Sequence, residues 1–347
     1  MRVPHSPVIL FATASLIPFG LLACAVVAGG AWVWAPLLYM TLFAAALDQI
    51  VPWIAPHTDG DEFPAGDSLL VTLALAHFVM LAVVVWTVAG TSTLGPGDRA
   101  VLALGAGLVF GQISNPAAHE MIHRPQRGLF RLGMAIYTSL LFGHHTSAHR
   151  LVHHSRAASV GDPNTARVGE SYYRFARRAW IGSFRAGRTA ENRRRAQNGG
   201  LHPYWIYLAG AALALGFGFV LAGWAGVAVW VLLAGHAQAQ LLLADYVQHY
   251  GLLRSVLSDG RTEPVNDRHS WNAPHWFSAR LMLNAPRHSD HHAHPSRSFT
   301  ALRLPASADA PMLPYPLPVC CTMALVPPLW RLVIHPHLVR WQPENPA

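Results

Sequence analysis

The sequence predicts an all-α integral membrane protein with about six transmembrane helices. Two observations lead to this fold class. Of the 347 residues, 52% are hydrophobic and only 12% are charged, whereas a soluble domain carries roughly 25% charged residues. The hydrophobic residues also gather in long apolar segments, each close to the roughly 20 residues that a helix needs to cross the hydrocarbon core. This composition excludes a disordered chain, a coiled coil and an ordinary water-soluble domain.

The apolar segments define the expected helices. We expect transmembrane helices at 8–30, 31–50, 68–90, 99–118, 204–223 and 224–247. The first two would form a hairpin that turns near Gly29 and Gly30, and the last two a hairpin across Gly223. Two weaker apolar stretches, 129–143 and 312–334, are interrupted or short. We expect these two at the membrane interface or buried against the helices.

The basic residues predict the orientation of the chain. All 25 are arginine, and they are dense between Arg124 and Arg195. Cytoplasmic loops carry an excess of basic residues, so we expect this segment, and with six spans both termini, on the cytoplasmic side. We interpret 1–347 as a single membrane domain with cytoplasmic regions at 119–200 and 249–310. The formal charge of +8 accompanies no aromatic-interleaved recognition motif, so we expect no nucleic-acid partner.

Histidine is unusually frequent in this chain. There are 21 histidines against 17 carboxylates, and many of them fall in short clusters at the cytoplasmic ends of predicted spans. The clusters are His119 with His123, His149 with His153 and His154, His288 with His291 and His292, and a single His249 after the last span. Burying so many imidazoles beside a membrane is unfavourable unless a metal or hydrogen bonds satisfy them. The clusters therefore predict a metal site.

The spacing within the first two clusters predicts how the rings point. On an α-helix, residues i and i+4 lie on one face, so His119 and His123 can bind the same ion. His149 and His153 have the same spacing. His154 is rotated by about 100° from His153, so it can address a second ion or the other side of the first.

The number of histidines bears on which metal binds. The spacing of His288, His291 and His292 would place all three on one face of a helix. Together the clusters hold too many imidazoles for one tetrahedral zinc ion and suit two ions with five or six ligands each. Imidazole-rich sites bind iron, zinc, copper or nickel. The scarcity of carboxylates excludes the soluble di-iron bundle, which needs several glutamates, and leaves the histidine-rich di-iron class of membrane proteins.

Four sequence motifs carry a resemblance to a known family. They are HEMIHR at 119–124, HRLVHH at 149–154 followed by DPNTARVGESYYRF at 162–175, QHYGLLR at 248–254, and RHSDHHAHPSRSF at 287–299. From roughly residue 30 to 335, the chain resembles the alkane 1-monooxygenase branch of the membrane fatty-acid desaturase and hydroxylase superfamily. The HYG motif separates this branch from ordinary desaturases. One departure is Ala148, where the family usually has glutamate.

The resemblance implies a non-haem di-iron enzyme. It places the family's nine iron-binding histidines on His119, His123, His149, His153, His154, His249, His288, His291 and His292. The implied reaction uses O2 to hydroxylate the terminal methyl group of medium- or long-chain alkanes, with electrons from rubredoxin and its NAD(P)H-dependent reductase. It also implies a multi-pass protein of the bacterial cytoplasmic (inner) membrane. The active site would face the cytoplasm, and the alkane would enter from the bilayer.

Two further sets of residues are expected near the irons. Ligand histidines usually donate their second N–H to a carboxylate, which makes Glu120, Asp245 and Asp290 candidates for orienting them. Apolar side chains of the second and third spans are candidates for lining the substrate channel. The candidates are Trp32, Trp34, Leu38 and Phe78.

The sequence leaves other functions open. Xylene-type methyl-aromatic monooxygenases share the same motifs, and a fatty-acid hydroxylase or desaturase is a further alternative among enzymes. A membrane metal transporter or sensor is the alternative outside the enzymes. It would place histidines or carboxylates in mid-span, on a pathway through the bilayer, whereas the clusters here gather at one membrane face.

Overall fold

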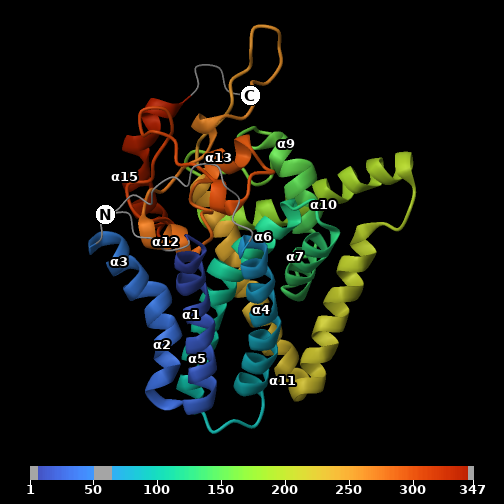
Figure 1. Ribbon diagram of the computed structural model, residues 1–347. Coiled ribbons are helices and arrows are strands. Elements are labelled where there is room, and N and C mark those ends of the chain that lie inside the picture. Colours follow the sequence, from blue (N-terminus) through green and yellow to red (C-terminus); the bar gives the residue numbers. More distant parts are fainter. Residues whose placement is uncertain (1–6, 51–64, 343–347) are drawn as a thin grey trace.

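The structure is a computed structural model that describes residues 7–50 and 65–342. Within these ranges the chain forms helices and no β-sheet, which confirms the predicted all-α fold. Figure 1 shows long helices side by side in the lower half and shorter helices gathered above them. The molecule therefore has two layers, a bundle of long helices and a cap of short ones.

Five helical stretches are long and apolar enough to cross a membrane. The first is α1 (Pro7–Ala28) and the third is α4 (Ala65–Ala89). The second runs through η1 (Gly30–Val33), α2 (Trp34–Leu38), η2 (Tyr39–Phe43) and α3 (Ala44–Ile50). The fourth runs through α5 (Pro96–Val109), the π-helical turn η3 (Phe110–Ser114) and α6 (Asn115–His123). The fifth is α11 (Pro203–Gln248).

The longest of these helices, α11, consists of two arms. Ala222 and Gly223 have non-helical backbone angles, and Gly223 has a φ of +60°, which an L-residue with a side chain rarely adopts. Figure 1 shows the first arm descending from the cap and the second returning to it. With α11 counted as two arms, the described residues contain six long apolar helical segments, in agreement with the prediction of about six transmembrane helices.

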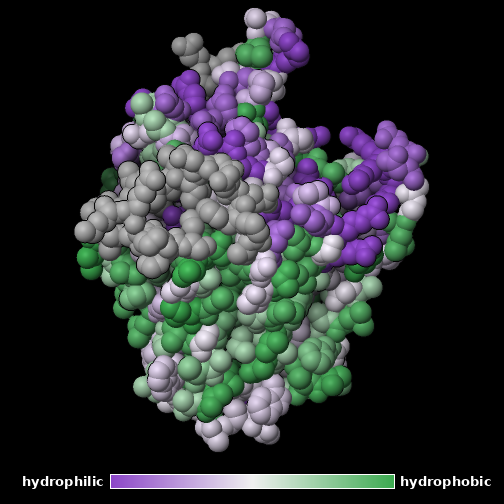
Figure 2. Space-filling model, in the orientation of Figure 1, coloured by the Kyte–Doolittle hydropathy of each residue, from purple (hydrophilic) through white to green (hydrophobic). Residues whose placement is uncertain are grey.

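The surface of the bundle is apolar, as lipid contact requires. Figure 2 shows a broad hydrophobic surface over the long helices and a hydrophilic surface above it. Large apolar side chains of α11 lie on this surface, with Val220 and Trp224 each 78% exposed. An exposed apolar surface of this extent is expected of a protein that faces lipid rather than water.

The cap consists of the remaining helices, most of them short. They are α7 (Arg127–Ser139), α8 (His145–Ala148), η4 (His149–His153), α9 (His154–Arg156), α10 (Tyr172–Asn198), η5 (Asp267–His269), α12 (Trp276–Leu281), α13 (His288–Ala293), η6 (Phe299–Ala301), α14 (Leu317–Ala324), α15 (Pro327–Leu338) and η7 (Val339–Trp341). The two weaker apolar stretches form α7, which packs against α6 and α11, and α14 with α15, of which α14 packs against α11. Both stretches are therefore packed against the bundle.

Buried polar side chains fasten the bundle and the cap together. His77 of α4 contacts the hydroxyl groups of Ser114 and Ser139, each at 2.9 Å from a ring nitrogen. At the end of the second span, the Asp48 carboxylate accepts hydrogen bonds from the backbone N–H of Phe277 at 2.7 Å and of Ser278 at 3.2 Å. A carboxylate that accepts from the free N–H groups at a helix start stabilises that start. Asp48 thus holds α12 against the membrane bundle.

The two arms of α11 pack closely at Gly226, and this contact can be tested. A Cβ atom at Gly226 would lie 2.0 Å from the backbone oxygen of Gly218. We expect Gly226→Ala to lower the free energy of unfolding by about 1–3 kcal/mol, as overpacking does, and thermal unfolding in detergent measures this. Gly235→Ala is the control, because a Cβ atom there meets nothing within 4 Å. Equal unfolding temperatures for the two variants would contradict the close packing of the arms.

Candidate metal centre

The nine histidines singled out in the sequence meet at the boundary between the bundle and the cap. They come from four stretches of chain that are far apart in sequence: α6, the segment from η4 to α9, the residue after α11, and α13. The structure divides them into one group of five and one group of four. Each residue of a group offers a ring nitrogen that lies within 4.8 Å of those of the other members.

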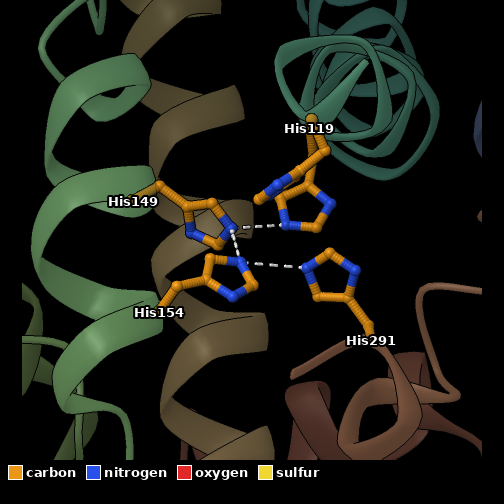
Figure 3. A group of neighbouring side chains, drawn as sticks. His119, His149, His154 and His291 are labelled. Atoms are coloured by element: carbon orange, nitrogen blue, oxygen red, sulfur yellow. Dashed lines mark hydrogen bonds between the residues drawn. The ribbon is translucent and has the colours of Figure 1, made fainter. Parts of the chain in front are cut away.

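The first group holds five imidazoles. Its members are His119, His123, His149, His154 and His291. The Nε2 atoms of His119 and His149 are 2.7 Å apart, those of His149 and His154 are 2.9 Å apart, and those of His154 and His291 are 3.2 Å apart. Figure 3 shows these four rings turned toward one another, with His119 on one helix, His149 and His154 on a second, and His291 on the segment below.

The second group holds four imidazoles, all of them buried. Its members are His153, His249, His288 and His292. The Nε2 atom of His288 lies 3.0 Å from that of His249 and 3.1 Å from that of His292. The two groups are neighbours, because the ring centres of His154 and His292 are only 4.7 Å apart. The arrangement therefore has room for two adjacent ions, each with its own set of ring nitrogens.

A π-helical turn explains how the second motif serves both groups. Residues His149–His153 form this turn, η4, between α8 and α9. In a π-helical turn residue i hydrogen-bonds to i+5 rather than i+4, so His149 and His154 face the same group while His153 faces the other. The α-helical spacing predicted that His149 and His153 could share an ion. That prediction is wrong, because the turn is wider than the α-helix that it assumed.

The last motif is divided in the same way. His291 belongs to the first group, whereas His288 and His292 belong to the second. The three rings still lie close together, with ring centres 4.6–6.0 Å apart, so the expected shared helix face serves two adjacent groups rather than one ion. The α-helical pair i, i+4 stays together, and the residue between its members points to the neighbouring group.

The ring nitrogens fit metal ions better than they fit hydrogen bonding among themselves. The Nε2 atoms of His149, His154 and His288 each lie within 3.2 Å of two other ring nitrogens. A ring nitrogen carries either one proton or one lone pair, so it cannot satisfy two such neighbours. The Nε2 atoms of His123 and His153 are buried and have no hydrogen-bond partner among the described residues. A cation at the centre of each group would satisfy all of these lone pairs.

The protonation of the rings also suits metal binding. Burial lowers the pKa of His249 to about 3. Burial, and then the neighbouring histidines, lower the pKa of further rings well below the ordinary value; these are His149, His154, His288, His291 and His292. Neutral imidazole is the form that binds a metal. A group of four suits a tetrahedral ion, whereas a group of five requires an ion with a larger coordination number.

From the sequence, three carboxylates are expected to orient the ligand histidines: Glu120, Asp245 and Asp290. Each of them contacts other groups of the protein. Glu120 accepts a hydrogen bond from the backbone N–H of Phe299 at 3.0 Å and lies 3.2 Å from the Arg124 guanidinium. It thereby joins α6 to the segment that follows α13. Asp245 accepts a hydrogen bond at 2.6 Å from the side-chain amide of Asn164.

Asp290 fastens the end of the last motif. Its Oδ1 contacts the Nδ1 of His294 at 3.1 Å and the Arg297 guanidinium, and its Oδ2 accepts from the backbone N–H of Arg303 at 2.7 Å. His294 and Arg297 belong to neither histidine group. These contacts make Asp290 a brace for the loop after α13.

Asp162 is the carboxylate that the sequence reasoning missed. Its Oδ2 lies 2.8 Å from the Nδ1 of His153 and also accepts a hydrogen bond from the Thr165 hydroxyl at 2.8 Å. Burial alone would raise the pKa of Asp162, but His153 and the hydrogen bonds hold it below its ordinary value. Asp162 therefore fixes the ring of His153 with its Nε2 toward the second group. The Asp-Pro pair soon after the second motif was the available signal.

A cavity of about 350 Å³ opens beside both groups. His119 and His149 of the first group and His288 of the second lie in its wall. The remaining wall is mainly apolar and comes from the second and fourth spans, α11 and α14; it includes Met40, Leu42, Ala45, Leu108, Leu241, Leu243, Leu317, Val319 and Leu325. Asp245 lies in this wall as well. The ring nitrogens can therefore be reached from an apolar chamber inside the bundle.

The predicted channel residues do not line this cavity. Trp32, Trp34 and Leu38 are 44–50% exposed on the outside of the bundle. Phe78 packs edge-on against His77 of the same helix, with the ring centres 5.2 Å apart. The second span does contribute to the wall, but through residues 40–45 nearer to the histidines. The third span, which carries Phe78, contributes no residue to this wall. The four channel residues therefore stay a prediction, since an apolar span does not reveal which of its faces turns inward.

Comparisons with known proteins agree with this geometry. Residues 99–322 match the family model described as fatty acid desaturase. The chain is 33% identical to the alkane 1-monooxygenase of Pseudomonas putida over 272 residues, which cover 76% of this chain but only 66%, just under two thirds, of that relative. It is 33% identical to alkane 1-monooxygenase 1 of Pseudomonas aeruginosa over 283 residues, which cover 78% of this chain and 72% of the relative. All nine histidines lie within the matched range 99–322.

The role of Asp162 can be tested by metal content. Asp162→Asn keeps the shape of the side chain but removes the charge that orients His153. We expect roughly 10- to 100-fold weaker metal binding in the second group, as for other partners of ligand histidines. Elemental analysis after a mild chelator would find about one ion fewer per chain than in the unaltered protein.

Glu263→Gln is the matched control for this variant. Glu263 lies 3.1 Å from the Nε2 of His269, which belongs to neither group. Equal metal retention by the Asp162 and Glu263 variants would contradict the assigned role.

Proposed function

The chain belongs to the fatty acid desaturase family, among relatives of the alkane 1-monooxygenases, and from that premise we propose that it is a di-iron monooxygenase acting on the terminal methyl group of medium- or long-chain alkanes. The observation that carries the proposal is the pair of neighbouring histidine groups whose rings form part of the wall of an apolar cavity. The relatives are named for alkane hydroxylation.

The chain's own residues hold two ions and place the substrate. We propose that the five imidazoles of the first group bind one iron and the four of the second bind the other. When bound, the irons would supply the reduction of O2 and the oxidation of a C–H bond. The apolar wall would exclude water and hold an alkane so that its end, rather than a weaker methylene C–H bond, meets the metal site. Positioning would then decide which carbon is hydroxylated.

The electrons would come from a partner. The sequence has three cysteines, Cys24, Cys320 and Cys321, which do not form the four-thiolate iron site of a rubredoxin. We propose rubredoxin, with an NAD(P)H-dependent reductase, as the donor. The outer face of α10 carries exposed arginines, including Arg174, Arg177 and Arg185, and a positive surface of this kind attracts an acidic partner.

The arginines also support an orientation in the membrane. They gather in the cap rather than in the bundle. By the positive-inside rule, we propose that the cap and the histidine groups face the cytoplasm and that the protein lies in the cytoplasmic membrane. Six membrane-crossing segments would then leave the start of α1 and the end of η7 on the side of the cap.

One feature of the cavity favours a second candidate, a fatty-acid hydroxylase. Gln112 and Gln240 both line the cavity, with the amide nitrogen of Gln112 at 3.4 Å from the amide oxygen of Gln240. The Oε1 atom of Gln112 is buried and has no hydrogen-bond partner in the part of the chain that the structure describes. An alkane would leave this acceptor unsatisfied, which is unfavourable. A chain that carries a hydroxyl or a protonated carboxyl could donate to it.

Product analysis distinguishes these functions. The purified protein, loaded with iron and supplied with rubredoxin and its reductase, would be given octane, longer alkanes, xylene and a fatty acid. We expect primary alcohols from the alkanes. Methylbenzyl alcohol without any octanol would instead support the methyl-aromatic alternative. Zinc in place of iron, with no turnover of any substrate, would reject the oxygenase.

A variant of Gln112 separates an apolar from a polar substrate. Gln112→Leu replaces the unsatisfied amide by an apolar group of similar volume. If the substrate is an alkane, we expect kcat/KM for octane to rise several-fold, since removing an unsatisfied polar atom amounts to about 1–3 kcal/mol at most.

Gln49→Leu is the control for this variant, because Gln49 is exposed and lies outside the cavity wall. A fall in kcat/KM for octane in Gln112→Leu alone would contradict a purely apolar binding mode.

A further inference from the structure

A second cavity, of about 340 Å³, is lined by five arginines. It lies between α7, the segment from α8 to η4, the end of α10 and the start of α11, and none of the nine histidines lines it. The arginines are Arg127, Arg131, Arg150, Arg194 and Arg195. Three separate stretches of chain thus bring guanidinium groups to one cavity.

The positive charge of this cavity is poorly balanced. Its one lining carboxylate is Glu191, so five positive charges against one negative charge leave a formal excess of four. The Oε1 atom of Glu191 already accepts from the Ser147 hydroxyl at 2.8 Å, and its Oε2 lies 3.8 Å from the Nε of Arg195. Like charges gathered around one cavity repel each other and favour the binding of an anion.

The polar wall contains a donor that lacks a partner. The hydroxyl of Thr146 lines the cavity, its residue is only 1% exposed, and it has no hydrogen-bond partner in the described chain. A buried hydroxyl without a partner is unfavourable. Beside it, the Arg150 guanidinium lies 4.9 Å from the centre of the Phe130 ring, a cation–π contact that holds it in place. An anion in the cavity could accept from the Arg150 guanidinium.

The other part of the wall is apolar and lies where the membrane begins. Met134, Leu151, Leu201 and Ile206 line it. Leu201 and Ile206 are 65% and 42% exposed, and they flank Pro203, the first residue of the last membrane-crossing stretch. Figure 2 shows the hydrophilic surface of the cap directly above the apolar surface of the bundle. The cavity therefore joins a cationic wall to an apolar wall at this boundary.

We propose that this cavity binds the phosphate headgroup of an anionic membrane phospholipid, with an acyl chain along the start of α11. Guanidinium groups bind phosphate oxygens in a bidentate manner, and basic pockets between membrane helices on one face are known binding places for anionic lipid headgroups. The apolar wall favours a lipid over free phosphate. The recess between four helices favours a headgroup over a folded acidic protein. A bound lipid would brace α7, α10 and α11 around the second histidine motif.

Lipid titration of the iron-loaded, full-length protein tests the proposal. The protein in neutral detergent would be titrated with phosphatidylglycerol or with phosphatidylcholine, and bound lipid would be measured by native mass spectrometry. We expect a preference for phosphatidylglycerol that the double variant Arg127→Gln/Arg194→Gln weakens by roughly 10- to 30-fold, from the contribution of each basic residue near an anionic lipid. Arg177→Gln/Arg193→Gln is the matched control, because both arginines are exposed and neither lines the cavity.

Competition experiments distinguish the possible occupants of the cavity. Inorganic phosphate, glycerol phosphate and polyglutamate would be added as competitors of phosphatidylglycerol. Full displacement by either phosphate at equal concentration would assign the cavity to a soluble anion, and full displacement by polyglutamate would assign it to an acidic protein. Equal weakening in the two double variants, or no preference for phosphatidylglycerol, would also overturn the proposal.

If a variant fails to fold, the proposal can still be tested on the unaltered protein. Photoreactive phosphatidylglycerol should crosslink within residues 127–134 or 194–206, and crosslinks confined to other segments would contradict the assignment. All of these readouts are independent of turnover, so a failure of the proposed hydroxylase function would leave them unaffected.

Discussion

The fold depends on one constraint: nine imidazoles must be buried next to each other at the edge of a membrane bundle. Ring nitrogens within 4.8 Å of one another in groups of five and four cannot satisfy each other by hydrogen bonds alone. Such a cluster is unfavourable in the absence of a cation. Two adjacent ions would turn this unfavourable burial into a source of stability, since the free energy of metal binding contributes to folding.

Much of the rest of the structure serves to place these rings. The π-helical turn at 149–153 sends the histidines of one motif to both groups. Asp162 orients His153, Glu120 joins α6 to the segment after α13, and Asp48 holds α12 on the bundle. Each contact links elements that are remote in sequence. The histidine groups thus lie where the cap meets the membrane helices and is fastened to them at several points, which is what a site needs in order to keep its geometry.

The sequence predicted the features that depend on composition and spacing. The apolar segments gave the membrane helices, Gly223 marked the turn in α11, and the clusters identified the nine histidines that meet. It did not predict how the rings divide, because the π-helical turn at His149 breaks the α-helical spacing without a visible signal. Asp162 was missed because a loop brings it back to His153. The wall of the cavity could not be predicted, because a uniformly apolar span hides its inward face.

The central claim is that the chain holds two neighbouring metal ions, one in each histidine group. Elemental analysis together with Mössbauer spectroscopy of protein enriched in iron-57 tests it most directly. The account predicts two irons per chain and two distinct iron signals, because one ion would have five imidazole ligands and the other four. A single metal ion per chain, or zinc with no iron, would contradict it.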